Sequence, residues 1–333
     1  MNNKLDVNKI VSRYRALFLF VITFTVLSFV APDFFNFYNI TTILQGASLN
    51  AIVAIGFTAV LIAGELDLSV GAVVMFSGML SIGLQPDLTW GGSFLVAVAV
   101  GALVGLINGL LVAKAKTNSF IVTLGTMTML HGLLILYSGG GSVLAQNFVL
   151  SDWLTKPIIP LMPPIVIFMF ILVGAASFVL QRTGLGRGLF MVGSNPEAAW
   201  EAGLNRDMYI IGTFVLSATI SAVGGALVAI KLGSMPATSF LGQRTLMKVL
   251  AAVIIGGTSL DGGEGSILQS FFAVLFLGTV LNAIGTYGLG FSYQILANGL
   301  IMAAVVLYGA YTQYKERLTR GERPYLLEEL ENR

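Results

Sequence analysis

The sequence predicts an all-α, polytopic membrane protein with about ten transmembrane helices. Of its 333 residues, 56% are hydrophobic and 10% are charged, and the mean hydropathy is +0.87. Soluble domains carry about 25% charged residues, so this composition is that of an integral membrane protein. Apolar runs long enough to cross a bilayer recur along the chain, and Lys and Arg gather in the segments between alternate runs.

Five apolar spans precede the middle of the chain. The first follows four basic side chains, which place the N-terminal segment, residues 1–15, in the cytoplasm. We do not interpret this span as a cleavable signal, because Pro32 follows it directly and aromatic residues surround the candidate cleavage point. Lys114 and Lys116 place the end of the fourth span inside as well. The five spans cover residues 16–31, 38–63, 71–84, a stretch that ends at 113, and 120–137.

Five further spans follow and complete an even number of crossings. Basic residues again mark the inner ends, at residues 181–207 and in the C-terminal tail, residues 312–333, so we expect both termini in the cytoplasm. Spans 2–5 and 7–10 then run in opposite directions, which is the inverted repeat of many transporter folds. Together the spans form one transmembrane domain, residues 16–311. The last five cover residues 165–180, 208–230, a stretch that ends at 256–257, 267–284 and 291–311.

The longest polar interruption, residues 181–207, predicts a short helix outside the bilayer. Ser194 or Asn195 caps its start, a proline occupies the first helical position, and Glu197 stands three positions after Ser194, as in a capping box. Gly203 fits a left-handed stop directly after the helix, which is seven residues long on this interpretation. A helix pinned at both ends outside the membrane is suited to contact a partner.

Composition and spacing exclude several functions. The chain has no Cys, which excludes disulfides, zinc–thiolate sites and thiol catalysis, and its single histidine, His131, argues against a histidine-rich metal centre. An intramembrane enzyme would need paired acids, a Ser–His arrangement or metal ligands in register, and none of these occurs. The spans are almost free of ionisable groups, which disfavours an ion-coupled secondary transporter.

Two carboxylates, Glu65 and Asp67, interrupt the apolar sequence between the second and third spans. Carboxylates are costly there unless they face water or protein. Two interpretations stay open: they cap the start of the third span, since helix N-termini favour acidic groups, or they lie at a broken helix that the glycines permit. The segment comprises Gly64, Glu65, Asp67, Ser69 and Gly71.

A second glycine-rich link predicts a tight inner turn between the eighth and ninth spans. It lacks the Gly-Lys-Ser/Thr of a phosphate-binding loop, and so does the rest of the chain, so we do not expect this chain to bind a nucleotide. The free energy for transport then has to come from a partner or an ion gradient. The turn comprises Gly256, Gly257, Thr258, Gly262, Gly263 and Gly265.

Small and hydroxylated residues mark two spans. Gly101, Gly105 and Gly109 form a ladder on one face of the fourth span, which lets a neighbouring helix approach closely. An amide and two hydroxyls enter the fifth span, where they either bond to the backbone or line a polar path. This second set is Asn118, Thr123 and Thr126.

Four ordered stretches that span most of the chain resemble the ribose-type sugar permeases of bacterial ABC importers, a family related to branched-chain amino-acid permeases. They are GELDLSVGAVV at 64–74, NSFIVTLGTM at 118–127, GRGLFMVGSNPEAAWEAGLN at 186–205 and GGTSLDGGEGS at 256–266. The resemblance implies a permease subunit in the bacterial cytoplasmic (inner) membrane that translocates a monosaccharide or related small polar solute by alternating access. A branched-chain amino-acid ABC permease is the alternative within this class.

The same resemblance implies a set of partners. These are cytoplasmic ABC ATPase subunits, a second permease that is identical or different, a periplasmic or lipid-anchored substrate-binding protein, and membrane lipid, with no nucleic acid. ATP and Mg belong to the ATPase subunits, so this chain binds no cofactor and has no catalytic residue. The short external helix becomes the coupling helix that docks in the ATPase groove. It consists of Pro196, Glu197, Ala198, Ala199, Glu201 and Gly203.

The eighth span departs from the family pattern. In the ribose-type permeases that this sequence resembles, the helix that leads into the Gly-Gly-Thr turn usually looks as if it begins with acidic residues. Here two basic residues, Arg244 and Lys248, stand in that stretch, one helical turn apart. On one interpretation Lys248 reaches the outer headgroups and Arg244 is exposed. On the other, both line the outer pathway and favour a sugar that carries negative charge.

Overall fold

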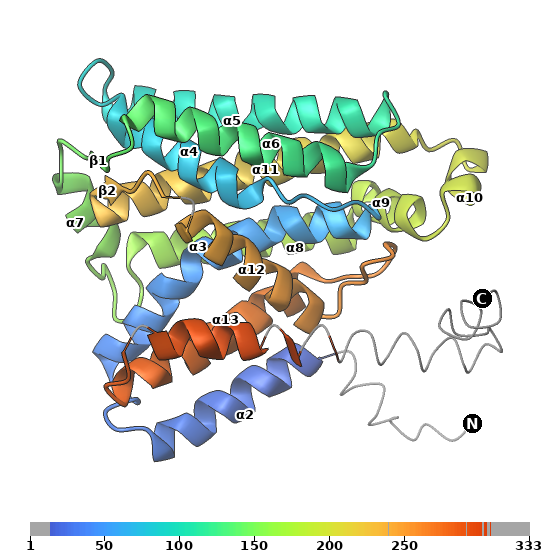
Figure 1. Ribbon diagram of the computed structural model, residues 1–333. Helices are drawn as coiled ribbons and strands as arrows, with labels where there is room; N and C mark the ends of the chain where they lie inside the picture. The colour runs from blue at the N-terminus through green and yellow to red at the C-terminus, as the bar shows by residue number, and fades with distance from the viewer. Residues whose placement is uncertain (1–13, 239, 291, 302, 305–306, 308–333) are drawn as a thin grey trace, which may run out of the picture.

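The computed structural model describes residues 14–238, 240–290, 292–301, 303–304 and 307. Long helices that run along a common direction form the body of the molecule, and a two-stranded sheet closes one end (Figure 1). The elements are α2 (Arg15–Val30), α3 (Phe37–Ile62), α4 (Val70–Gly83), α5 (Trp90–Ala113), α6 (Ser119–Ser138), β1 (Val143–Leu144), α7 (Val149–Thr155), α8 (Pro164–Arg182), α9 (Gly184–Ser194), α10 (Pro196–Glu201), α11 (Arg206–Leu232), β2 (Ser234–Met235), α12 (Phe240–Ile255) and α13 (Ile267–Thr286).

The chain is a multi-pass membrane protein. Within the described residues, six helices are long and apolar enough to cross a bilayer, namely α3, α5, α6, α8, α11 and α13. The apolar helices α2 and α4 are shorter than a full crossing. The predicted tenth span, residues 291–311, is helical over 292–301, and the tail at 312–333 and most of the segment at 1–15 lie outside the described residues. The prediction of about ten spans is thus supported only in its coarser form.

The helices α4 and α12 are short because each begins inside the bundle. Residues 64–69 follow α3 and are not helical, and they run back between the helices before α4 starts (Figure 1). Residues 233–238 precede α12 in the same way. At the two starts Gly71 and Gly242 meet backbone to backbone, since a Cβ on either glycine would collide with the carbonyl oxygen of the other. This crossing tolerates no side chain.

Helix α11 lies at the centre of the bundle and packs against α3, α4 and α5. The ladder of Gly101, Gly105 and Gly109 on α5 contacts α11, and a Cβ on Gly105 would lie 2.5 Å from the Phe214 carbonyl oxygen. This is the close approach that the spacing of the three glycines predicts. Backbone contact of this kind lets dispersion forces act where lipid offers no hydrophobic drive between helices.

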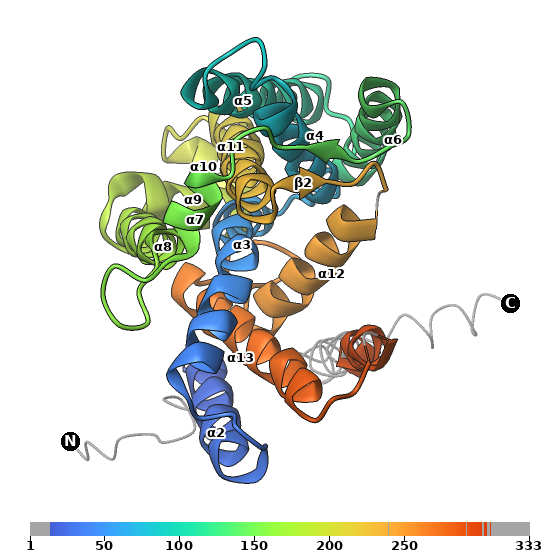
Figure 2. The ribbon, with the colours of Figure 1, turned by 90° about the vertical axis from the view of Figure 1, so that its left-hand side faces the viewer.

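The two ends of the bundle differ in structure. Figure 1 shows α9 and α10 at one end, here called the α10 end, and β1, β2 and α7 at the opposite end, here called the strand end, which faces the viewer in Figure 2. The antiparallel pair β1–β2 is a small exception to the predicted all-α class. It joins the α6–α7 connection to the segment between α11 and α12.

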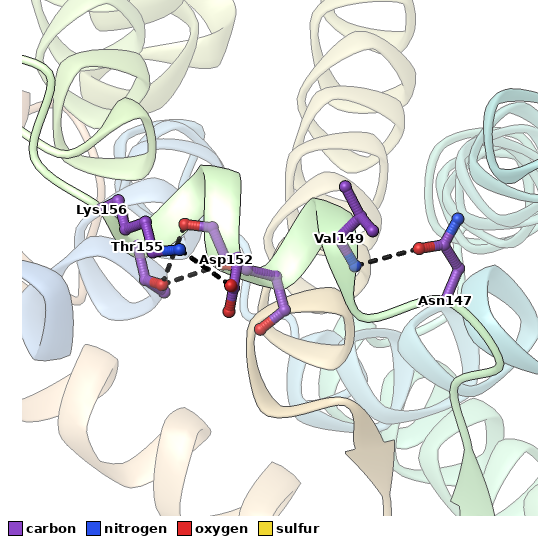
Figure 3. A network of polar contacts seen from close by, with 6 residues as sticks. Asn147, Val149, Asp152, Thr155 and Lys156 are labelled. Carbon is purple, nitrogen blue, oxygen red and sulfur yellow. Dashed lines mark hydrogen bonds and ion pairs between the residues drawn. The ribbon is translucent and has the colours of Figure 1, made fainter.

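Helix α7 is held by local contacts (Figure 3). Asn147 Oδ1 accepts a hydrogen bond from the Val149 backbone N at 2.9 Å, and Lys156 Nζ lies 2.9 Å from Asp152 Oδ2 at the other end. Both members of the ion pair are well exposed, so the pair contributes little to stability. Ser151 Oγ donates to the Lys231 carbonyl oxygen at 2.8 Å and so ties α7 to the end of α11.

Candidate functional site

The external helix predicted from the polar segment is α10. Asn195 caps it, because its Oδ1 accepts hydrogen bonds from the backbone N of Glu197 at 3.1 Å and of Ala198 at 3.0 Å. Gly203 has φ +79° and forms the expected left-handed stop. The helix ends at Glu201 and has six residues rather than seven. The capping box is wrong, because Ser194 is the last residue of a further helix, α9, which the sequence did not predict.

Helix α10 presents most of its side chains to the surroundings. Pro196, Glu197, Ala198 and Glu201 are exposed, and Ala199 is buried against the bundle. Trp200 is 75% exposed, although it is the largest apolar side chain of the helix. Sequence analysis passed over this residue, and the signal was a tryptophan within a charged, extramembrane segment. Tryptophan is the residue most enriched among energetically dominant interface contacts.

Behind α10, three glycine-lined segments meet backbone to backbone. Gly193, at the end of α9, lies so close to the Ile62 carbonyl oxygen that a Cβ there would collide with it. The same oxygen accepts a hydrogen bond from the Gly263 backbone N at 2.9 Å. A Cβ on Gly262 would lie 2.8 Å from the Gly64 Cα. The end of α3, the end of α9 and the turn at residues 256–266 therefore form one junction, here called the glycine junction.

The remaining residues of this turn hold the end of α12. Gly257 has φ +91°, and the Arg15 guanidinium lies beside it. Arg15 donates to the carbonyl oxygens of Ile255 at 2.9 Å and Ile254 at 2.8 Å, which satisfies groups that a helix C-terminus leaves open. Gly256 packs against the backbone of α13, and Gly265 packs against the Thr258 side chain.

The Glu65 carboxylate lies near the α10 end. Its Oε1 is 3.5 Å from Arg206 Nη2, and its side chain is only 12% exposed. Burial raises the pKa of Glu65, while the Ser119 hydroxyl and the Arg206 guanidinium lower it. A second ion pair, Lys114 Nζ to Asp207 Oδ2 at 2.8 Å, joins the same ends of α5 and α11.

The Asp67 carboxylate is buried and is held by hydroxyls. Its Oδ1 accepts hydrogen bonds from the Ser69 backbone N at 3.0 Å and from Ser69 Oγ at 2.6 Å, and its Oδ2 accepts one from Ser217 Oγ at 3.1 Å. Ser69 in turn accepts from Asn108 Nδ2 at 3.1 Å, and Asn108 Oδ1 accepts from Thr126 Oγ1 at 2.6 Å. Asp67 thus holds the link before α4 at a broken helix, and its bonds within the described residues go to Ser69 and Ser217 instead of to the backbone N–H groups in the first turn of α4.

Among the polar residues predicted at α6, only Thr126 belongs to this network within the described residues. Asn118 caps α6 by accepting from the Phe120 backbone N at 2.9 Å. Thr123 Oγ1 donates to the carbonyl oxygens of Ser119 at 2.7 Å and Leu66 at 3.3 Å. The bonds of Thr123 are the bonds to backbone of the first interpretation, whereas Thr126 bonds to the Asn108 side chain. The structure does not bring Asn118, Thr123 and Thr126 together with Arg244 and Lys248.

Lys248 lines two adjoining cavities, one between α3, α12 and α13 and the other between α3, α11 and α12. Each has a volume of about 200 Å³, and both are bordered by Gly46, Asn50 and Lys248. Arg244 lines the second cavity and is half-buried rather than simply exposed. The other polar side chains of the lining are Thr42, Gln45, Lys231, Thr245, Asn282 and Gln294. Sequence analysis missed the amides of this set, although an amide within an apolar span is itself a signal.

Comparison with known proteins identifies relatives along nearly the whole chain. Residues 39–310 match the family model described as branched-chain amino acid transport system / permease component. The chain is 31% identical over 319 residues to the ribose import permease protein RbsC of Haemophilus influenzae, which covers 93% of this chain and 97% of that protein. It is 32% identical to the ribose import permease protein RbsC of Bacillus subtilis, with 88% and 90% covered. It is also 32% identical to the D-allose transport system permease protein AlsC of Escherichia coli, with 89% and 91% covered. No solved structure matches the chain.

Proposed function

The chain belongs to the family of branched-chain amino acid transport system permease components, and we propose that it is the permease subunit of a bacterial ABC importer for a monosaccharide or related small polar solute. The relatives named above are permeases for ribose and allose, which favours a sugar over a branched-chain amino acid. The family confirms the resemblance in the four sequence stretches. Because the relatives are permeases, ATP hydrolysis is a task of partner subunits, which also hold ATP and Mg.

The observation that carries the proposal is the form of α10. A helix capped by Asn195, stopped by Gly203 and displaying a 75% exposed Trp200 outside the long helices is suited to dock in a groove of an ATPase subunit. Met208, at the start of the neighbouring helix α11, is a further exposed apolar side chain, with 70% of its surface accessible. A protein partner explains why such a surface is apolar in water.

The glycine junction supports a route from α10 to the pathway. Motion of α10 passes to α9 directly, and Gly193 of α9 contacts the end of α3 and the turn at residues 256–266. From there the buried contacts of Asp67 reach the start of α4 and the centre of α11. Closely packed backbones transmit a displacement instead of absorbing it. In this mechanism closure of the ATPase pair rocks the two parts of the bundle, which gives alternating access.

The two short helices support an inverted repeat. The pairs α3–α4 and α11–α12 each consist of a long span, a non-helical link and a helix that begins inside the bundle. Discontinuous helices of this kind mark substrate sites near the bilayer midplane in transporters with inverted repeats. The contact between Gly71 and Gly242 places the two helix starts at the same depth, and Leu241, next to Gly242, lines one of the two cavities that Lys248 borders.

The orientation follows from charge. Arg187, Arg206 and Lys114 lie at or near the α10 end, which supports a cytoplasmic position for it and for both termini in the inner membrane. The strand end then faces the substrate-binding protein. A second permease, identical or different, completes the pathway.

The experiment that tests the proposal compares two exposed tryptophans. Trp200→Ala on α10 removes the docking side chain, and Trp153→Ala on α7 removes a 57% exposed side chain at the strand end. Loss of a central interface tryptophan costs about 2 kcal/mol or more, which is more than a tenfold loss of affinity. We expect Trp200→Ala to reduce co-purification with the ATPase subunits and to abolish uptake, and Trp153→Ala to leave co-purification unchanged. Normal co-purification of Trp200→Ala would contradict the docking role of α10.

A further inference from the structure

The ammonium group of Lys248 has no described counter-charge. No hydrogen bond or ion pair joins its Nζ to any residue that the structure describes, although the side chain is half-buried. Arg244, a second cation, stands four residues earlier, one turn away on the same helix. A half-buried cation next to another cation is unfavourable unless a bound anion or water compensates it.

Lys248 lies within α12 and borders both cavities. Helix α12 begins inside the bundle, where Gly242 contacts Gly71. Six residues later, at a rise of 1.5 Å per residue, Lys248 lies about 9 Å further along the helix. The Lys248 side chain therefore faces the space between the helices that line the two cavities.

The cavity lining is cationic and carries no described carboxylate. Lys231, Arg244 and Lys248 contribute three positive charges, and the described residues of both linings include no Asp or Glu. Lys231 Nζ lies 3.4 Å from the Gln45 carbonyl oxygen, and the Arg244 guanidinium lies 5.6 Å from the centre of the Phe240 ring. Cavities lined by side chains of one sign of charge concentrate ligands of the opposite sign.

The amides that share this lining suit a hydroxylated ligand. Asn50, Asn282 and Gln294 come from different parts of the chain and border the cavity next to Lys248. Asn282 donates to Asn39 Oδ1 at 2.9 Å, and its own Oδ1 is buried with no hydrogen-bond partner among the described residues. Side-chain amides donate to and accept from hydroxyl groups, and an ammonium group donates to an anion.

From these observations we infer that the cavities around Lys248 receive a sugar that carries a negative charge, as a carboxylate or a phosphate group, with Lys248 and Arg244 as specificity-determining residues. The inference rests on the proposed function, because it treats the cavities as part of a sugar pathway. The cations select the anionic group, and the amides bind the hydroxyls. A carboxylate and a phosphate group are both anions that these cations would bind, and the test below distinguishes between them.

The chain contains no Cys, so one substitution creates a unique reporter thiol in it. In the assembled transporter, Asn50→Cys is treated with anionic sulfonatoethyl and cationic trimethylammonioethyl methanethiosulfonate, and the labelling of this chain is followed by mass spectrometry. Rates are normalised to Trp153→Cys at the strand end. We expect the anionic reagent to react about tenfold faster in relative terms, within the range of electrostatic enhancement in charged clefts.

The charge variants decide which residue is responsible. In the Asn50→Cys background, Lys248→Gln is expected to remove most of the preference, whereas Lys248→Arg preserves it. Lys156→Gln, which removes an exposed cation of α7, is the matched control and is expected to change nothing. Equal rates for both reagents, or a preference that survives Lys248→Gln, would overturn the inference.

Protection of the same thiol tests the ligand. D-glucuronate, D-glucose 6-phosphate and D-glucose compete with the neutral reagent methyl methanethiosulfonate. We expect at least one of the two anions to protect at a concentration about tenfold lower than D-glucose, and the better one identifies carboxylate or phosphate. Equal protection by D-glucose, or no protection by any of them, refutes the inference. Labelling requires neither ATP nor uptake, so this outcome is distinct from failure of the transporter proposal.

Discussion

A single methyl group on Gly105 is predicted to destabilise the permease. The Cβ of Gly105→Ala would lie 2.5 Å from the Phe214 carbonyl oxygen and 2.8 Å from the Val215 Cα, while ordinary contacts begin at 3.4 Å. Both neighbours are backbone atoms of α11 and cannot turn aside. Helices α5 and α11 must therefore separate by about 1 Å along a close-packed seam, and overpacking of this kind costs about 1–3 kcal/mol.

Gly125 on α6 provides the matched control. A Cβ there would have no neighbour within 4 Å, so Gly125→Ala only gains helix propensity, which is worth about 1 kcal/mol. The two variants make the same chemical change in two apolar helices, and we expect their stabilities to differ by about 2–4 kcal/mol. The assay is the midpoint of thermal unfolding of the purified permease in detergent, followed by fluorescence-detected size-exclusion chromatography. Gly105→Leu should fail to assemble. If Gly105→Ala is as stable as Gly125→Ala, the close contact between α5 and α11 does not require a glycine at position 105.

Two further predictions concern the buried carboxylate and the end of α10. Asp67→Asn keeps an acceptor for Ser69 and should give a folded permease. Asp67→Leu leaves three buried donor groups unpaired, which costs about 1–3 kcal/mol for each group, so this variant should not fold. The yield of monodisperse permease in detergent distinguishes the two variants, and equal yields would contradict a role of Asp67 in holding α4. Gly203→Val forces a β-branched residue to φ +79°, which costs about 1–2 kcal/mol or more. We expect this variant to uncouple ATP hydrolysis from uptake. ATPase activity and uptake are measured on the same vesicles, and full uptake would show that the left-handed stop after α10 is dispensable.

Local rules predicted the parts of the site that depend on neighbours in sequence. The cap by Asn195 and the left-handed Gly203 follow from the chemistry of single residues at helix ends, so α10 could be placed to within one residue. The starts of α3 and α6 were predicted equally closely, because apolar runs bounded by polar residues define them. The α5 glycine ladder was predictable for the same reason, since its period is that of a helix face.

Other features depend on contacts between distant segments. The sequence of α9 contains four glycines, which disfavour a helix, yet Gly186 and Gly193 are needed there because backbone approaches them closely. The interior start of α12 depends on its crossing with Gly71, more than 150 residues earlier. The lining around Lys248 combines residues of α3, α12 and α13, so no single stretch of sequence identifies the cavity.

The most direct test of the account is the energy source of uptake. The permease is reconstituted in proteoliposomes with its ATPase subunits and its substrate-binding protein, and sugar uptake is measured with and without ATP on the ATPase side. The account predicts that uptake requires ATP and persists when ionophores collapse the proton and sodium gradients. Uptake that follows an imposed ion gradient and ignores ATP would contradict it and identify a secondary transporter.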